Sequence, residues 1–185
     1  MIICGCDEAG RGPLAGPVTA AAVILSEDFP SDLLADSKKL SPKKRQKSAC
    51  ALMAGTSLFS IGWVWPEEID RINIHNASLL AMERALYGIP VDPDNIFVDG
   101  LFIPRTDCPC KAIVKGDTKI PEIQAASILA KVARDRWMVL YSRIDSRFEF
   151  EKHKGYPTLR HRELIHKYGL SSIHRKSFKS SYFPS

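Results

Sequence analysis

Two acids, three glycines and one arginine stand close together near the start of the chain. Asp7 and Glu8 follow a short apolar run, and the turn Gly10-Arg11-Gly12 comes directly after them. Carboxylates are ligands that hard divalent cations prefer, and glycine lets the backbone come close to a ligand. The planar guanidinium of arginine can hold two oxygens of a phosphate. This combination predicts a metal-dependent enzyme that acts on a phosphodiester.

Two more acids are expected where strands end. Asp99 follows the apolar run 96–98, and Asp117 comes shortly after another apolar run. In open α/β sheets, ligands bind where strand ends meet loops. Converging carboxylates are costly unless cations neutralise them. We therefore expect Asp7, Glu8, Asp99 and Asp117 to bind metal, and two cations about 3.5–4 Å apart would activate a water and stabilise the leaving oxygen.

Asp7 and Glu8 are neighbours, which sets a geometric condition on any shared site. Successive side chains of a regular strand face opposite sides of the sheet. The two acids can share a site only if the strand bends or ends between them, or if one of them acts through a water. Ala9-Gly10 follows at once, so a break in the strand is expected here.

The apolar patterns place these acids on strands that alternate with helices. The expected strands are 2–6, 17–25, 57–64, 95–98 and 112–114, with the first two antiparallel across the glycine-rich turn. The expected helices are 41–53, 76–87, 121–144 and 158–168. In the third helix, apolar residues recur on one face at gaps of three and four, from Ile123 to Ile144. The order of elements indicates an α/β fold with a mixed sheet.

The composition fits a globular protein with a polyanionic partner. The 185 residues allow one sizeable core. The net charge is +5, and the basic residues cluster in the segments 38–47 and 152–179. No apolar run is long enough to span a membrane. Five cysteines and no expected signal peptide indicate a reducing cytoplasm rather than a disulfide framework. The histidines that we expect to be structural or surface residues rather than ligands are His153, His161, His166 and His174.

Several blocks of the sequence resemble the motifs of bacterial ribonuclease HII. The opening block is Asp7-Glu8-Ala9-Gly10-Arg11-Gly12-Pro13-Leu14-Ala15-Gly16-Pro17. The blocks that follow it in family order are 36–40, 98–100, 115–117, 125–135, 153–158 and 174–178. They cover nearly the whole chain, and together they are far more specific than any one tripeptide.

The resemblance implies a ribonuclease-H-like α/β fold, with a mixed five-stranded sheet flanked by helices. It implies one catalytic domain over residues 1–185 with a short helical C-terminal part. We expect the protein to act as a monomer, in the cytoplasm that the cysteines indicate. The implied activity is cleavage of the RNA strand of RNA–DNA hybrids and of single ribonucleotides embedded in duplex DNA. Water activated by metal is the expected nucleophile, so the products should carry 5′-phosphate and 3′-hydroxyl ends.

Residue by residue, the resemblance also assigns site roles. The positions that match the four catalytic acids binding Mg²⁺ or Mn²⁺ are Asp7, Glu8, Asp99 and Asp117. The positions that match the segment whose backbone senses a ribose 2′-hydroxyl are Gly10, Arg11 and Gly12; this hydroxyl distinguishes RNA from DNA. Tyr156 matches the tyrosine that packs at the RNA–DNA junction. Lys38 and Lys115 are further candidates for contacts with the substrate.

Two alternatives stay open at this point. Another nuclease of the same fold, such as a DNA resolvase, is disfavoured by the Gly10-Arg11-Gly12 turn. A hybrid-binding module without catalysis is disfavoured by the intact set of four acids. The chain departs from the family pattern after Phe178, where seven residues end it and many relatives continue. This departure bears on hybrid affinity and not on the chemistry.

Overall fold

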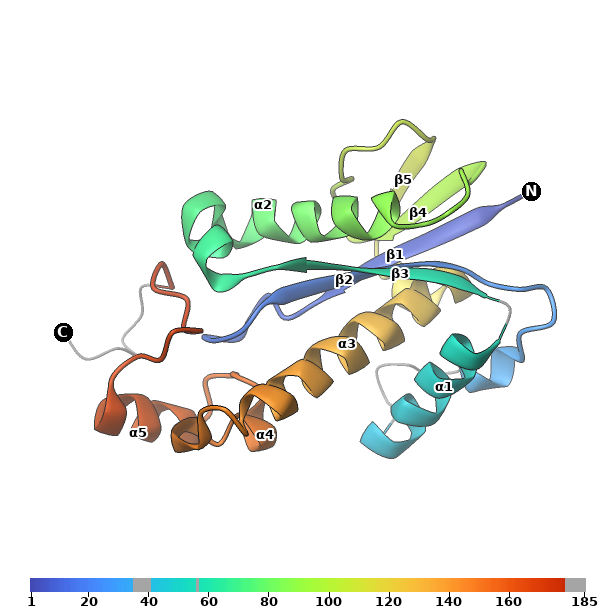
Figure 1. Cartoon of the computed structure of the whole chain (residues 1–185). Helices are drawn as coiled ribbons and strands as arrows, with labels where there is room; N and C mark the ends of the chain where they lie inside the picture. Colours follow the sequence, from blue (N-terminus) through green and yellow to red (C-terminus); the bar gives the residue numbers. More distant parts are fainter. Residues whose placement is uncertain (35–40, 56, 179–185) are drawn as a thin grey trace.

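The computed structural model describes residues 1–34, 41–55 and 57–178 (Figure 1). At its centre is a sheet with the strand order β3-β2-β1-β4-β5. The strands are β1 (Ile3–Ala9), β2 (Val18–Ile24), β3 (Leu58–Val64), β4 (Asn95–Asp99) and β5 (Cys110–Ile113). β1 pairs antiparallel with β2 and parallel with β4, so the predicted mixed five-stranded sheet is confirmed.

Helices cover both faces of this sheet (Figure 1). α2 (Pro66–Tyr87) packs on one face, mainly against β2 and β3, and α3 (Pro121–Tyr141) packs on the other, mainly against β1 and β2. α1 (Pro42–Ala54) lies against α3, and α4 (Phe150–His153) and α5 (Leu159–Tyr168) follow α3 in the chain. The short 3-10 helices are η1 (Ser31–Leu33), η2 (Gly116–Thr118) and η3 (Ser146–Phe148). Within the described ranges, none of the helices combines the length and apolar character needed to cross a membrane.

The alternation of side chains along the central strands produces two cores. On β2, Ala20 and Ala22 belong to the apolar cluster against α2, whereas Ala21 and Val23 belong to the cluster against α1 and α3. Gly5 of β1 faces α3, where an added Cβ atom would stand 2.1 Å from a backbone carbon. Small residues therefore let α3 lie close to β1, the strand that carries the first two acids.

Helix α2 begins at Pro66, whereas the sequence pattern predicts a start at Asn76. The backbone leaves the helical region at Asn73 (φ 65°, ψ 166°), and the Asn73 side chain accepts a hydrogen bond from the amide of Asn76. The prediction therefore captured only the segment after this kink. The first segment opens with Pro66 followed by Glu67 and Glu68, a helix start that the apolar pattern does not reveal.

Helix α3 is one long helix, as predicted, but its apolar face is not buried throughout. Ile123 and Ala130 are fully buried, whereas Leu140 is 48% exposed. The helix ends at Tyr141, so Ile144 lies beyond it and is 80% exposed. The last strand also differs from its prediction, since it occupies 110–113 rather than 112–114. The unburied end of the α3 face forms part of the surface.

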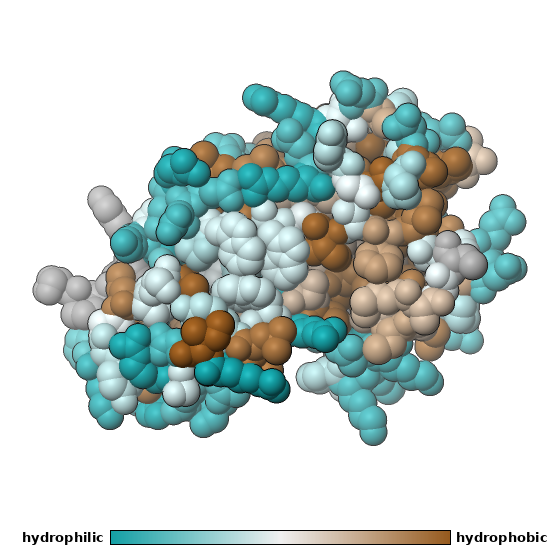
Figure 2. All heavy atoms as spheres, viewed as in Figure 1, coloured by the Kyte–Doolittle hydropathy of each residue, from teal (hydrophilic) through white to brown (hydrophobic). Residues whose placement is uncertain are grey.

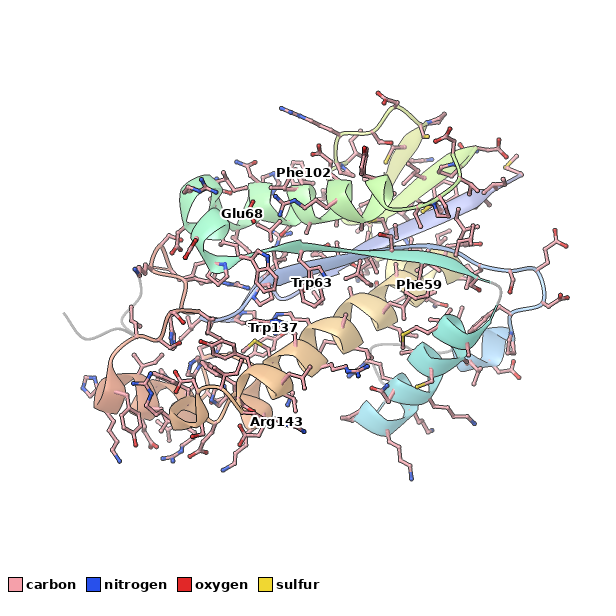
Figure 3. The ribbon with its side chains drawn as sticks, viewed as in Figure 1. Phe59, Trp63, Glu68, Phe102, Trp137 and Arg143 are labelled. Atoms are coloured by element: carbon pink, nitrogen blue, oxygen red, sulfur yellow. The ribbon has the colours of Figure 1, made fainter. Side chains whose placement is uncertain are left out.

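An aromatic row joins this end of α3 to the edge strand β3. The ring centroids of Trp63 and Trp65 are 5.8 Å apart, those of Trp65 and Trp137 are 5.3 Å apart, and Trp137 stacks on Tyr141. Apolar side chains gather on the surface over the junction of β3, α1 and α3 (Figure 2), and Trp63 and Trp137 lie in this region (Figure 3). The row therefore ties the edge of the sheet to the helix beneath it.

The segment 10–17, which joins β1 to β2, is held by two later parts of the chain. The amide of Leu14 donates to the Gly155 carbonyl at 2.8 Å, and the amide of Gly16 donates to the Ile173 carbonyl at 2.8 Å. In return, the Leu14 carbonyl accepts from the amide of Arg175 at 2.9 Å. The C-terminal part of the fold thus fixes the turn that follows the first two acids.

Candidate active site

Three of the predicted acids lie at one edge of the sheet. β1 and β4 run parallel side by side, and their last paired residues are Cys6 and Val98. Asp7 and Asp99 come directly after these two residues, and Glu8 is next along β1. Because the carboxyl ends of neighbouring parallel strands meet at the same edge, the expected clustering of these strand ends is what the fold provides.

The fourth acid is tied to the third through the backbone. Asp117 lies in η2, just after β5, and its residue is only 1% exposed. The Asp99 carboxylate oxygen Oδ1 accepts hydrogen bonds from the amides of Gly116 at 2.7 Å and Asp117 at 3.4 Å. These bonds hold the start of η2 against the end of β4, so Asp117 is anchored beside the same edge.

β1 does not break between the first two acids. Asp7 pairs with Ala21 and Glu8 with Ala20, in regular register up to Ala9. The strand ends only at Gly10, where φ is +99°. Alternation therefore directs Asp7 toward α3 and Glu8 toward α2, and the expectation that a break would turn both to one side is wrong. The ladder with β2 keeps the strand regular through both acids.

Burial and like charges raise the pKa values of the acids on β1. Burial raises the pKa of Asp7 well above its usual range, and the carboxylates of Glu8 and Asp99 raise it further, while the Ser127 hydroxyl of α3 opposes the rise. Burial also raises the pKa of Glu8, against the effect of Arg11, whose guanidinium lies 3.4 Å from the carboxylate. The ionised forms of these acids are therefore costly on their own, and a bound cation would stabilise them.

The donors at this edge suit a hard divalent cation. All four candidates are carboxylates, the oxygen ligands that Mg²⁺ and Mn²⁺ take in proteins. Across the ranges that the structure describes, no three His, Cys, Asp or Glu side chains come close enough to form a ready-made metal site. Like charges oppose such convergence until a cation neutralises them. The residues present fit a cation, and the carboxylates would close around it on binding.

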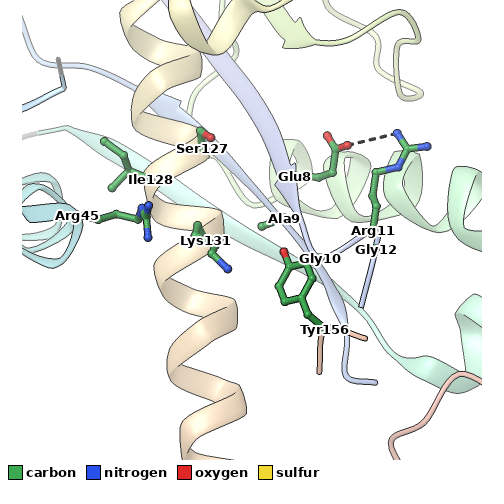
Figure 4. A pocket seen from close by; sticks show the side chains of 10 residues that line it. All are labelled: Glu8, Ala9, Gly10, Arg11, Gly12, Arg45, Ser127, Ile128, Lys131 and Tyr156. Atoms are coloured by element: carbon green, nitrogen blue, oxygen red, sulfur yellow. Dashed lines mark hydrogen bonds and ion pairs between the residues drawn. The ribbon is translucent and has the colours of Figure 1, made fainter. Parts of the chain in front are cut away.

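An open groove of about 440 Å³ lies beside the acids (Figure 4). Its lining residues are Glu8, Ala9, Gly10, Arg11, Gly12, Arg45, Ser127, Ile128, Lys131 and Tyr156. A second hollow, of about 160 Å³, has Glu8, Arg11 and Asp99 in its lining. Glu8 and Arg11 therefore form the ridge between two hollows. The larger groove combines an acid, exposed backbone and basic side chains, which is the combination a phosphodiester substrate requires.

Tyr156 faces this groove from the C-terminal part of the chain. Its side chain is partly exposed, and the Lys131 ammonium lies over its ring at 5.1 Å from the centroid. A Cβ atom added at Gly12 would stand 3.9 Å from the Tyr156 ring. The structure thus places the predicted tyrosine next to the predicted glycine turn in the lining of one groove.

The predicted lysines are less central. Lys115 is exposed next to η2, with a left-handed backbone (φ 56°), and it lines neither hollow. Lys38 lies outside the described residues. Lys131 and Arg45 line the groove instead, and neither is among the predicted substrate contacts. A signal for Lys131 was available, because it belongs to the block 125–135 that resembles the family.

Two buried arginines that are not among the predicted site residues lie behind the turn. Arg134 and Arg175 are both 0% exposed. Arg134 donates to the carbonyls of Ala15 and Pro17, and Arg175 donates to that of Gly16. Both arginines stand in blocks that resemble the family. Their partners, however, lie more than 100 residues away in the chain, so no local pattern reveals them.

Three of the four histidines that we expected to be structural or surface residues are buried in the structure. His153, His161 and His174 are buried, and the rings of His153 and His161 stack at 4.2 Å. His161 Nδ1 lies 2.9 Å from the Tyr156 carbonyl and must donate to it, so its Nε2 accepts from Nε2 of His174 at 3.1 Å. The Nδ1 of His174 then accepts from the amide of Ser171. Both ring nitrogens of each of the three histidines are thus engaged in hydrogen bonds within the protein.

Comparison with known proteins gives the family. The sequence profile described as Ribonuclease HII matches residues 4–181. The ribonuclease HII of Idiomarina loihiensis is 51% identical over 177 residues, which span 96% of this chain and 95% of that protein. The ribonuclease HII of Nitrosospira multiformis is 51% identical over 176 residues, which span 95% of this chain and 88% of that protein.

Solved structures agree with this result. The ribonuclease H2 from Pyrococcus horikoshii OT3 is similar with a TM-score of 0.82 at 26% identity, covering 97% of this chain and 94% of that chain. The RNase HII from Archaeoglobus fulgidus, solved as a complex with PCNA, has a TM-score of 0.81 at 27% identity and covers 97% and 96%. Bst-RNase HIII in complex with Mn²⁺ has a TM-score of 0.75 at 20% identity, covering 96% of this chain and 67% of that chain, and supports the fold alone.

Proposed function

This chain belongs to the ribonuclease HII family, and on that premise we propose that it cleaves single ribonucleotides embedded in duplex DNA as well as the RNA strand of RNA–DNA hybrids. As a ribonuclease H it is a hydrolase that acts on nucleic acid.

The four acids are the proposed ligands of Mg²⁺ or Mn²⁺. When bound, such cations activate a water and stabilise charge on the phosphate. The chain's part is to present the carboxylates: the amides of Gly116 and Asp117 orient Asp99, and the amide of Glu8 donates to Asp7 at 2.7 Å. Because Glu8 faces the other side of β1, it would act through a water or from the second hollow. With water as nucleophile, the products carry 5′-phosphate and 3′-hydroxyl ends.

One observation carries the proposal. Asp7 and Asp99 follow the last paired residues of neighbouring parallel strands, and the groove that begins at Glu8 continues along Gly10, Arg11 and Gly12. Metal-binding oxygens and exposed backbone thus stand side by side. A site for DNA alone would not need backbone donors beside its metal, whereas a ribose hydroxyl is read by such groups.

The remaining candidates complete the substrate side of the proposal. Tyr156 packs on the sugar at the junction, beside Gly12 in the lining of the groove. The exposed Lys115 contacts a phosphate near η2, and Lys38 is kept as a candidate from the sequence alone. All of these groups come from one chain, so the proposal needs no second subunit and treats residues 1–185 as one catalytic domain.

Metal dependence and product ends test this proposal. A duplex with one ribonucleotide, labelled at the 5′ end, is incubated with the enzyme in Mg²⁺ or in EDTA, and the products are identified by mass. We expect cleavage only with Mg²⁺, with 3′-hydroxyl and 5′-phosphate ends, and nearly none by Asp99→Asn. A cyclic phosphate or 3′-phosphate end, or cleavage in EDTA, would mean that the 2′-oxygen rather than water attacks.

A further inference from the structure

Two arginines are buried behind the Gly10-Arg11-Gly12 turn without acidic partners. Arg134 and Arg175 are both 0% exposed, yet in the described part of the chain no carboxylate lies within ion-pair distance of either. Burying an unpaired charge is costly unless hydrogen bonds replace the lost water. Two such charges in one place call for an explanation other than general stability.

Backbone carbonyls satisfy both guanidinium groups. Arg175 donates to the carbonyls of Gly10 at 2.6 Å, Arg11 at 3.1 Å and Gly16 at 2.9 Å. Arg134 donates to those of Ala15 at 3.0 Å, Pro17 at 2.9 Å and Lys154 at 3.0 Å. Five of these six carbonyls belong to the segment 10–17. The planar fork of each arginine therefore fixes several peptide units at once, which a point charge could not do.

The direction of the carbonyls determines the direction of the amides. In a trans peptide unit the N–H points away from the C=O, and no peptide bond in the described chain is cis. The carbonyls of Gly10 and Arg11 point inward to Arg175, so the amides of Arg11 and Gly12 point outward. Both residues line the groove, and neither amide donates to another group of the described protein.

We propose that Arg134 and Arg175 are positioning residues, which hold the segment 10–17 so that the amides of Arg11 and Gly12 point into the groove and donate to an oxygen of the nucleic acid. This inference rests on the proposed function, because it deepens the role given to the turn. Consecutive outward amides form a concave set of donors that suits an oxygen with negative or partial negative charge. In this site the oxygen is the 2′-oxygen of the ribose, and a phosphate oxygen is the other source with the same chemistry.

Lysine substitutions separate positioning from charge. Arg175→Lys and Arg134→Lys keep a positive charge but cannot bond three carbonyls in a plane. Arg136→Lys, on the exposed side of the same helix as Arg134, is the matched control. For each enzyme, kcat and KM are measured on a duplex with one ribonucleotide, and the inhibition constant Ki is measured for the all-DNA duplex of the same sequence. Folding is checked by circular dichroism.

We expect KM to rise about tenfold in Arg175→Lys, with kcat within threefold and Ki within twofold of the wild-type values. A loss of folded protein would lower the apparent kcat but leave KM and Ki unchanged, so this pattern distinguishes positioning from stability. An equal rise in KM and Ki supports positioning toward a phosphate oxygen instead of the hydroxyl. Arg136→Lys should leave all three constants unchanged.

Two results would overturn the proposal. Folded Arg134→Lys and Arg175→Lys enzymes with wild-type KM and Ki would show that the amides do not depend on the arginines. If neither variant folds, the arginines serve the fold as a whole and the separate positioning role fails. Failure of the proposed function is a different result, because the wild-type enzyme would then not cut the ribonucleotide duplex at all.

Discussion

The Cβ atom of an alanine at position 10 would clash with the side chain of Arg134. The ideal Cβ stands 2.2 Å from Nε and 2.5 Å from Cδ of Arg134, and 2.9 Å from the Pro17 carbonyl oxygen. Gly10 also has φ +99°, a backbone conformation that residues with a side chain rarely adopt. The substitution therefore strains the backbone and displaces an arginine whose hydrogen bonds hold the turn.

Two costs set the magnitude. A residue with a Cβ in this backbone conformation is less stable by about 1–3 kcal/mol. Displacing Arg134 leaves the Pro17 carbonyl buried without its donor, which costs about 1–3 kcal/mol more. The sum, roughly 2–6 kcal/mol, is a large part of a typical free energy of unfolding. For a chain of this size we expect Tm to fall by roughly 5–20 °C.

Gly12→Ala is expected to behave differently. Gly12 is not among the glycines with positive φ, and its added Cβ would meet only the Tyr156 ring at 3.9 Å, an ordinary contact. Less freedom in the unfolded chain could raise stability by about 0.4–1 kcal/mol. The new methyl group, however, stands in the groove where the sugar should lie. Loss of one close backbone contact should lower kcat/KM on a single-ribonucleotide duplex by about tenfold.

Thermal unfolding followed by circular dichroism and steady-state cleavage together check this contrast. Gly169→Ala is the control, since Gly169 has φ +73° in open space and follows α5, away from the groove. It should lose about 1–3 kcal/mol of stability and keep its cleavage constants. A Gly10→Ala enzyme that melts at the wild-type temperature, or a Gly12→Ala enzyme that melts lower than Gly10→Ala, would show that the Cβ at position 10 does not displace Arg134.

Three further predictions concern charge. Asp7→Asn should nearly abolish cleavage. It should also raise Tm in EDTA, by about 2–4 °C for each kcal/mol of repulsion that it relieves, because burial and like charges disfavour the ionised Asp7 and raise its pKa. A lower Tm than that of the exposed control Asp28→Asn would contradict this. Burial lowers the pKa of His161 to about 4 and of His174 to about 3, from 6.5, so the native state keeps them neutral while the unfolded state binds protons. The contribution of these histidines to the free energy of unfolding should be fully present above pH 6.5 and fall by about 1.4 kcal/mol per pH unit per histidine toward pH 4. The free energy of unfolding, measured with urea at several pH values, should depend less steeply on pH in His174→Gln than in the wild type; an equal pH dependence would refute the assignment. Replacing the exposed lysines of α1 together by glutamine (Lys43, Lys44 and Lys47) should weaken duplex binding. The slope of the logarithm of affinity against the logarithm of salt concentration should decrease in magnitude by about 1 for each lysine that contacts a phosphate. Unchanged affinity and slope would show that these lysines do not contact the substrate.

The sequence predicts where the acids stand in the fold, because the apolar runs that precede them are local patterns. Asp99 follows an apolar run that reads as a strand, and the strand ends lie at one edge in the structure. The orientation of Asp7 and Glu8 was not predictable in the same way. It depends on whether β1 stays regular, and the ladder with β2, a distant pairing, decides that it does.

The support of the turn could not be predicted at all from local patterns. Arg175 and Gly10 are 165 residues apart. The contact between them joins a charged side chain to a backbone carbonyl, and every residue has a backbone carbonyl. No residue type at position 10 signals such a partner. The kink at Asn73 is similar, because an apolar pattern interrupted by polar residues reads as a loop before a helix, although the structure continues as two helical segments.

The most direct measurement compares two duplexes that differ in a single 2′-oxygen. The same sequence, with one ribonucleotide or with none, is assayed with wild-type enzyme in Mg²⁺ at one salt concentration. We expect cleavage beside the ribonucleotide and no detectable cleavage of the all-DNA duplex, since donors placed for a hydroxyl are left unpaired without it. Equal cleavage of the two duplexes would show that the turn does not read the 2′-oxygen, even if all four acids proved essential.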